Sequence, residues 1–154
     1  MIGKVKQWLG IEGVKLELDI PEEINKHDRV LHGRIRLQSM QAQFVTRIKV
    51  VLIERYSRGK GQEQLIDEYE LGAFVSNQKI EVPANELVEL DFTLPFQHYR
   101  SEIDEWEEQN VLFKGLAFAA KKLRRVRSEY RLEAEARVSG VALNPFDKKV
   151  VRLK

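Results

Sequence analysis

The fold class follows from one short stretch of the chain, Val88-Glu89-Leu90-Asp91-Phe92-Thr93-Leu94-Pro95. Apolar and polar side chains alternate in it without a break, and successive side chains of a β-strand point to opposite faces of a sheet. One face of this segment is therefore suited to burial and the other to water. Pro95 closes the stretch, because proline lacks the backbone N–H that strand pairing requires. The pattern predicts a half-buried strand of an antiparallel sheet.

The same alternation recurs on both sides of this stretch, with turn residues between the segments. Short strands spaced in this way are typical of an antiparallel β-sandwich of the immunoglobulin-like kind. We therefore predict a mainly all-β chain that forms one sandwich domain over residues 1–154. The predicted strands cover residues 14–20, 31–37, 44–56, 65–73, 80–82, 88–94, 130–138 and 151–153.

The longest predicted strand, residues 44–56, carries apolar side chains on both faces. Strands that are buried on both faces read as nearly continuous apolar runs, so we expect part of this strand to be covered on both sides and to lie inside a sheet. The short, charged stretch 78–82 instead has the character of a protected edge. One face of the long strand carries Phe44, Thr46, Ile48, Val50 and Leu52, and the other carries Val45, Val51 and Ile53. The stretch 65–73 presents Leu65, Tyr69, Leu71 and Ala73 on one predicted apolar face.

Two segments follow the helical period instead. From about residue 102 to 127, apolar side chains recur at steps of four and three, which places them on one stripe of a helix. Acidic residues gather at its start and basic residues at its end, and each group favours the helix dipole by about 0.3–1 kcal/mol. Asn110 and Gly115 leave two shorter helices as an alternative. A short N-terminal helix is predicted from Ile2, Val5 and Trp8, which share one face.

Composition limits the classes of function. The 154 residues include 26 Lys and Arg against 24 Asp and Glu, a net charge of +2 that gives no general attraction to nucleic acid or anionic lipid. The absence of cysteine excludes disulfides, thiolate zinc sites and a cysteine nucleophile. We see neither a secretory signal nor an apolar run of about 18 residues that could cross a bilayer, so a cytoplasmic location is expected.

Four segments resemble a known family. Residues 82–95 are similar to the turn and strand ending in Leu-Pro of arrestin-like N-terminal domains, and residues 128–138 resemble the strand that follows there. Residues 140–150, together with 13–18 after the opening helix, resemble the bacterial sporulation-control protein family within that superfamily. The resemblance implies an arrestin-like sandwich with adaptor or regulatory behaviour. That family usually carries two such domains in tandem.

Sequence patterns of enzymes are missing. The three histidines, His27, His32 and His98, are scattered without metal-ligand spacing, and scattered histidines are usually structural or solvated. The sequence holds no nucleophile elbow, no phosphate-binding loop and no dinucleotide fingerprint. We therefore predict no catalytic residue, no bound metal and no cofactor.

The strongest local signal for a binding site is a basic run at the end of the predicted helix. It could bind phosphate groups of a lipid, a phosphorylated partner or nucleic acid, and Trp8 could assist at a membrane surface. The alternative, which we favour, is a solvated helix end whose charge is offset by the upstream acids. The candidate residues are Lys121, Lys122, Arg124, Arg125, Arg127 and Trp8.

The expected function is that of a non-enzymatic protein-interaction, scaffold or adaptor domain with protein partners, among which identical subunits are possible. The alternative is a peripheral membrane or phosphate-binding module that uses residues 121–127. Nucleic-acid binding is disfavoured, because no basic sheet face with interleaved aromatic side chains is apparent.

Overall fold

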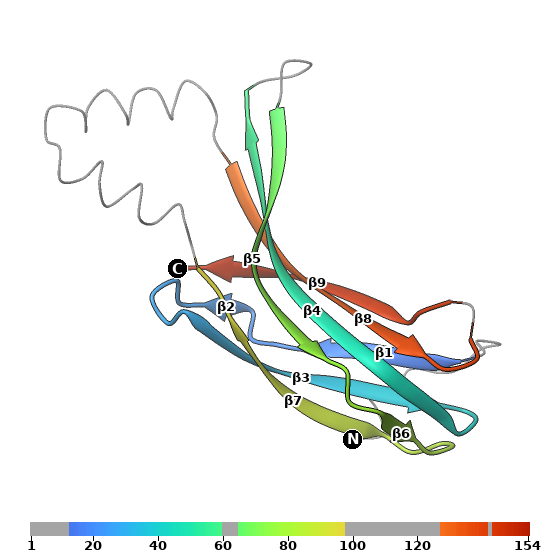
Figure 1. Ribbon diagram of the computed structural model, residues 1–154. Coiled ribbons are helices and arrows are strands. Elements are labelled where there is room, and N and C mark those ends of the chain that lie inside the picture. Colours follow the sequence, from blue (N-terminus) through green and yellow to red (C-terminus); the bar gives the residue numbers. More distant parts are fainter. Residues whose placement is uncertain (1–12, 60–64, 98–126, 142) are drawn as a thin grey trace, which may run out of the picture.

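The computed structural model describes residues 13–59, 65–97, 127–141 and 143–154, and these residues form two layers of β-strands (Figure 1). They contain strands but no helix. The predicted N-terminal helix and nearly all of the predicted helix at 102–127 lie outside the described residues. The strands are β1 (Val14–Asp19), β2 (Glu23–Ile24), β3 (Val30–Ser39), β4 (Gln43–Arg58), β5 (Leu65–Ser76), β6 (Ile80–Val82), β7 (Val88–Pro95), β8 (Arg127–Val138) and β9 (Phe146–Leu153).

One layer is a three-stranded antiparallel sheet in the order β1-β3-β7. The other has six strands in the order β2-β9-β8-β4-β5, with β6 paired to the beginning of β4. The predicted sandwich of antiparallel strands is correct except at β2, which runs parallel to β9 and makes the larger sheet mixed. A strand of two residues is too short to show alternation, so a period of two could not predict it.

The core lies between the two sheets, on the apolar faces that alternation predicted. In the stretch 88–95, Phe92 is 3% exposed and Leu94 is 0% exposed. Leu52 on β4 and Leu132 on β8 are directly opposite each other in the register and are both 0% exposed. Buried aliphatic side chains of this size each stabilise the fold by about 1.5–3 kcal/mol relative to exposure.

A β-bulge in β4 overturns part of the predicted face assignment. The register against β8 slips between Val45 and Arg47, so one extra residue is accommodated and the faces exchange beyond it. Val45 is consequently 0% exposed in the core, whereas Phe44 is 41% exposed and has the ammonium of Lys79 4.3 Å from its ring centroid. A bulge breaks the period of two on which the prediction depended.

A second irregularity corrects the predicted face of β5. The register against β4 slips between Leu52 and Ile53, and Leu71 has no partner in the ladder. Leu71 is buried, but Leu65 and Tyr69 are 56% and 42% exposed. Figure 1 shows the reason: the distal ends of β4 and β5 project beyond the three-stranded sheet, so that layer does not cover them.

The predicted positions of two strands within the sheet are confirmed. β4 lies inside the larger sheet, between β8 on one side and β5 and β6 on the other. The described partner of β6 is residues 43–45 of β4, which leaves β6 at an edge.

Arg127 belongs to a strand and not to the end of a helix. β8 begins at this residue, three positions before the predicted start at Tyr130. The long β4 extends to Arg58 and pairs Ser57 with Arg127, and the Ser57 hydroxyl donates to the Arg127 carbonyl at 3.4 Å. This pairing with a distant partner overrides the local helical period.

Candidate functional site

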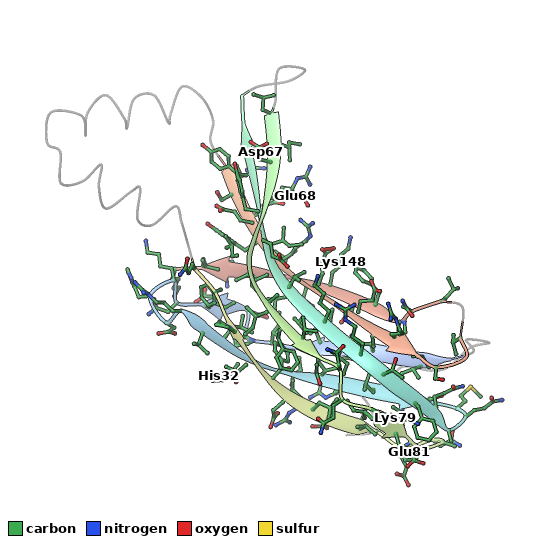
Figure 2. The ribbon with its side chains drawn as sticks, viewed as in Figure 1. His32, Asp67, Glu68, Lys79, Glu81 and Lys148 are labelled. Carbon is green, nitrogen blue, oxygen red and sulfur yellow. The ribbon has the colours of Figure 1, made fainter. Side chains whose placement is uncertain are left out.

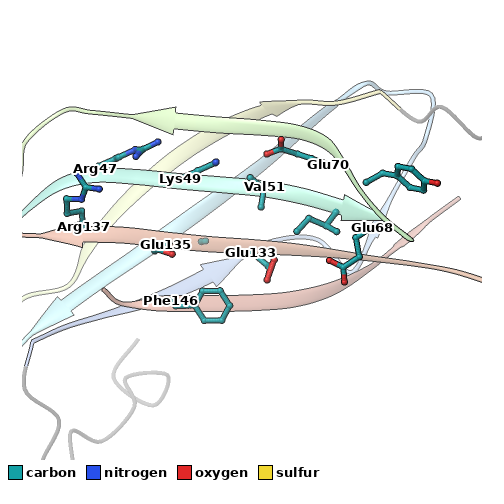
Figure 3. Close-up of a pocket in the computed structure, with 12 residues that line it drawn as sticks. Arg47, Lys49, Val51, Glu68, Glu70, Glu133, Glu135, Arg137 and Phe146 are labelled. Atoms are coloured by element: carbon teal, nitrogen blue, oxygen red, sulfur yellow. The ribbon is translucent and has the colours of Figure 1, made fainter. Parts of the chain in front are cut away.

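The outward face of the larger sheet is hollowed into a groove of about 590 Å³ (Figure 3). Its walls come from β4, β5, β8 and β9, and its length follows β4, which contributes the alternate residues Arg47, Lys49, Val51 and Ile53. The volume lies within the range of about 300–1,000 Å³ that ligand clefts occupy. Because apolar side chains and charges of both signs also line it, we take the groove as the candidate functional site.

The floor of the groove is partly apolar. Val51 and Ile53 on β4 are half-buried, and the Phe146 ring of β9 reaches the groove while 51% exposed. These side chains point away from the core, so they do not contribute to packing between the two sheets. Apolar side chains on an outward sheet face are suited to a contact with another molecule.

Three cations stand at one end of the groove. Arg47 and Arg137 are directly opposite each other in the register of β4 and β8, and Lys49 follows on β4 (Figure 3). None of the three forms an ion pair with another described residue. The Nε atom of Arg47 is buried and has no hydrogen-bond partner among those residues.

Carboxylates line the remainder of the groove. Glu68 and Glu70 come from β5, and Glu133 and Glu135 from β8 (Figure 3). Glu135 accepts a hydrogen bond from the Asn144 side-chain amide at 3.1 Å. The groove thus has a cationic end and an acidic remainder around a common apolar floor.

Next to the acidic part of the groove, an ion pair links β8 to β5 across β4. Arg131 of β8 lies between β4 and β9, and its guanidinium donates to the Glu68 carboxylate at 2.9 Å and approaches Glu133 at 3.6 Å. The hydrogen bond from Arg131 lowers the pKa of Glu68 below its usual range, and Glu68 raises the pKa of Arg131 in turn. The Glu68 side chain is half exposed and the Arg131 side chain is 23% exposed, so solvent still screens the pair and its contribution to stability is small.

We expect the Glu68 pKa to rise when Arg131 is replaced by methionine, because the hydrogen bond and the nearby positive charge are removed. A folded-state pKa below the unfolded value means that the pair stabilises the fold above the unfolded pKa. That contribution is lost as the pH falls through the lowered folded pKa. Carboxyl ¹³C NMR during an acid titration measures it, with Arg152→Met as the control. An unchanged Glu68 titration in Arg131→Met would contradict this assignment.

The outward face of the smaller sheet differs, because its charges are mutually satisfied. Arg34 pairs with Glu89 at 2.9 Å and Asp91 at 3.0 Å, and Arg36 pairs with Asp19 at 2.9 Å. Hydrogen bonding to Asp91 raises the pKa of Arg34. Cross-strand pairs of this kind are a usual feature of solvated sheet faces.

One buried carboxylate was not foreseen from the sequence. Glu54 of β4 is 1% exposed, and the Tyr130 hydroxyl of β8 donates to it at 3.2 Å. It lies on the inward face, where alternation favoured an apolar residue. A hydrogen-bonded carboxylate at such a position is compatible with a structural role.

Of the residues predicted for a basic binding site, the structure describes Arg127 alone, so their convergence is not tested. Lys121, Lys122, Arg124, Arg125 and Trp8 lie outside the described residues. Arg127 is exposed at the start of β8 and lines a small pocket together with Arg55 of β4 and Glu129 of β8. The phosphate-binding role of this run therefore stays a prediction.

The histidines that lie within the described chain are apart from the groove. His32 is on the outward side of the smaller sheet, across the sandwich from Glu68 and Lys148 (Figure 2), and its Nδ1 is 3.2 Å from the Thr93 hydroxyl. His27 occupies a turn, where its N–H donates to the Asn25 side chain. His98 is outside the described residues. Within the described ranges, no three His, Asp or Glu side chains converge to hold a metal ion.

The fold is similar to that of a protein whose structure has been solved. The chain resembles the crystal structure of Spo0M, a sporulation control protein from Bacillus subtilis, with a TM-score of 0.63 and 12% sequence identity. The two share a fold. The match covers 94% of this chain and 50% of the other, so this chain spans about half the length of Spo0M. At this identity the likeness establishes the architecture alone.

Two other comparisons find nothing. No model of a known protein family matches the chain, and no curated protein matches it. The two-sheet architecture expected from the sequence is supported by the likeness to the fold of Spo0M. Within the described part of the chain, no helix is long and apolar enough to span a membrane.

Sequence reasoning missed the groove, although one of its components was visible. The apolar residues Val51 and Ile53 lie on the second face of residues 44–56, but their pattern predicts that this face is covered, whereas in the structure they line the groove. The charges on the neighbouring strands come from β5 and β8, and the Phe146 ring comes from β9, all far from β4 in sequence. Only the register of the sheet places them beside β4.

Proposed function

We propose that this chain is a non-enzymatic protein-interaction domain that binds a segment of a partner protein in the groove of the larger sheet. The observation that carries the proposal is the combination of an apolar floor, Val51 and Phe146, with opposite charges along one groove. Such a surface suits a side-chain-bearing polypeptide better than a small metabolite, because it is long and has chemically different ends. A regulatory or adaptor role corresponds to this binding activity, and the fold shared with a sporulation control protein supports it.

The dimensions of the groove favour an extended segment. Arg47 and Ile53 are six residues apart on β4, which corresponds to about 20 Å along a strand. An extended peptide of about six residues covers the same distance. The backbone of β4 is engaged by β5 and β8 over this range, so recognition would use side chains and not strand addition.

The proposal is tested by altering the floor. We expect Val51→Ser combined with Phe146→Ser to weaken partner binding by about tenfold or more, because apolar contact area is lost. The full-length wild type and variant are used to capture partners from the native cell, and a purified partner is then titrated by calorimetry. Leu87→Ser removes an exposed apolar side chain beside the other sheet and serves as the control.

The outcomes separate clearly. A partner that binds wild type and Leu87→Ser equally, but binds the floor variant at least about tenfold more weakly, supports the groove. A partner that binds all three proteins with one affinity would contradict it. Circular dichroism verifies that the floor variant retains its strands, and the exposure of Phe146 makes its replacement compatible with folding.

A further inference from the structure

We propose that Arg47, Lys49 and Arg137 form a seat for carboxylates, and that the partner segment carries acidic side chains where it crosses this end of the groove. This inference rests on the proposed function and names the chemistry of its ligand. It starts from the contrast between cations on the same sheet face. Arg131 is neutralised by Glu68 at 2.9 Å and Glu133 at 3.6 Å, whereas no described residue forms an ion pair with the three cations of the seat.

The strand register makes the unneutralised charges of Arg47 and Arg137 unfavourable in the protein without a ligand. Arg47 and Arg137 occupy directly opposite positions on β4 and β8. Like charges at opposite positions in a sheet destabilise it, and an anion that bridges them would relieve the repulsion. Two guanidinium groups on one face also present the planar donor arrangement that suits carboxylate oxygens.

A second observation points to the same place. The Nε of Arg47 is buried within the described structure without a hydrogen-bond acceptor. A buried donor without a partner is unfavourable, and the great majority of such groups in folded proteins have one. Lys49 is opposite Glu135 in the register, but the hydrogen bond described for the Glu135 side chain comes from the Asn144 amide. Donors are therefore available at this end of the groove.

The surroundings of the seat favour an acidic peptide over a larger polyanion. Glu133 and Glu135 share the groove with the cations, and Glu68 and Glu70 continue it on β5. A nucleic acid or an anionic membrane would bring further negative charge against these carboxylates. A peptide can place acidic side chains on the seat and apolar or basic side chains on the remainder.

The test uses two short peptides and the full-length protein labelled with ¹⁵N. The probe is acetyl-Glu-Glu-Val-Val-amide, and its matched control has glutamine in place of both glutamates. We expect the probe to shift the Nε–H resonances of Arg47 and Arg137 saturably, with an apparent affinity at least about fivefold higher than that of the glutamine peptide. Inorganic phosphate and phosphatidylglycerol vesicles form two further arms.

Matched variants locate the response. Arg47→Gln combined with Arg137→Gln is expected to abolish saturable binding of the probe. Arg152→Gln combined with Lys154→Gln removes the same charge from a distant part of the larger sheet, where both cations contact Glu23, and should leave binding unchanged. If the probe binds the first double variant as it binds wild type, the proposal is overturned. A preference for phosphate or vesicles over the probe at these arginines would overturn it as well.

Thermal melting gives a readout that does not depend on the peptide. Because Arg137 opposes Arg47 in the register, Arg137→Gln is expected to raise the melting temperature of the free protein by about 1–3 °C. A fall of that size would contradict the inferred repulsion.

If the floor variant loses the partner but the arginines do not respond to carboxylates, the seat is refuted and the groove proposal stands. If the arginines respond but the floor variant binds the partner normally, the groove proposal is refuted.

Discussion

Replacing Gly72 by valine is expected to destabilise the protein by about 3 kcal/mol, at the upper end of the cost of overpacking. Gly72 of β5 forms an isolated bridge with Phe96, just after β7, and so joins the larger sheet to the smaller one. A Cβ atom at this position would collide with the backbone carbonyl oxygen of Pro95 and lie 2.9 Å from the Phe96 Cα. Backbone atoms cannot rotate away as the end of a side chain can, so β5 and β7 must separate.

The separation would disturb two neighbouring contacts. The Gln97 N–H donates to the Leu71 carbonyl at 3.0 Å, and Leu71 and Phe96 are 5% and 3% exposed. Urea unfolding measures the loss, with Gly140→Ala as the control. Gly140 has a φ of +77° and open space around its Cβ position, so alanine there should cost only the strain of that conformation, about 1–2 kcal/mol. If Gly72→Val lowers the free energy of unfolding by no more than Gly140→Ala does, the close approach of the two sheets at Gly72 is contradicted.

Replacing Leu52 by alanine is expected to destabilise the fold by about 2–5 kcal/mol. Leu52 is 0% exposed at the centre of β4, and the surrounding close-packed side chains can fill the resulting cavity only in part. Val75→Ala on β5 is the matched control, because Val75 is 45% exposed and should change stability by about 0.5 kcal/mol or less. Equal losses for the two variants would contradict the position of the core.

A double-mutant cycle tests the pairing of β4 with β8 directly. Leu132 is the register partner of Leu52 and is equally inaccessible to solvent. Side chains in contact typically couple by about 0.5–3 kcal/mol, so the double alanine variant should differ from the sum of the single losses. Additive losses would indicate that these two residues are not neighbours.

Much of the architecture was predictable from the sequence, because alternation reports burial directly. The strand at Val14–Asp19 and the strand at Val88–Pro95 agree with prediction to within a residue or two. The interior place of β4 follows from its apolar second face, and the edge place of β6 from its short, charged sequence. Each of these inferences uses a side-chain period that a strand retains wherever it lies in the sheet.

The errors occur where the period is interrupted or where a partner far away in the chain decides the outcome. The bulge between Val45 and Arg47 exchanges the faces of β4, and no local residue pattern announces it. The parallel pairing of β2 depends on β9, which lies more than a hundred residues later. Arg127 begins β8 and does not end a helix, because it pairs with Ser57 of β4.

The sequence by itself determined that the described chain is built of strands with an apolar face toward the core, because hydrophobic burial acts on each strand through its own alternation. Only the tertiary structure decided which outward side chains meet. The groove, the opposed Arg47 and Arg137, and the ion pair of Glu68 with Arg131 all depend on strand order and register. Register is a property of pairs of strands, and a shift by one residue would turn each of these side chains to the other face.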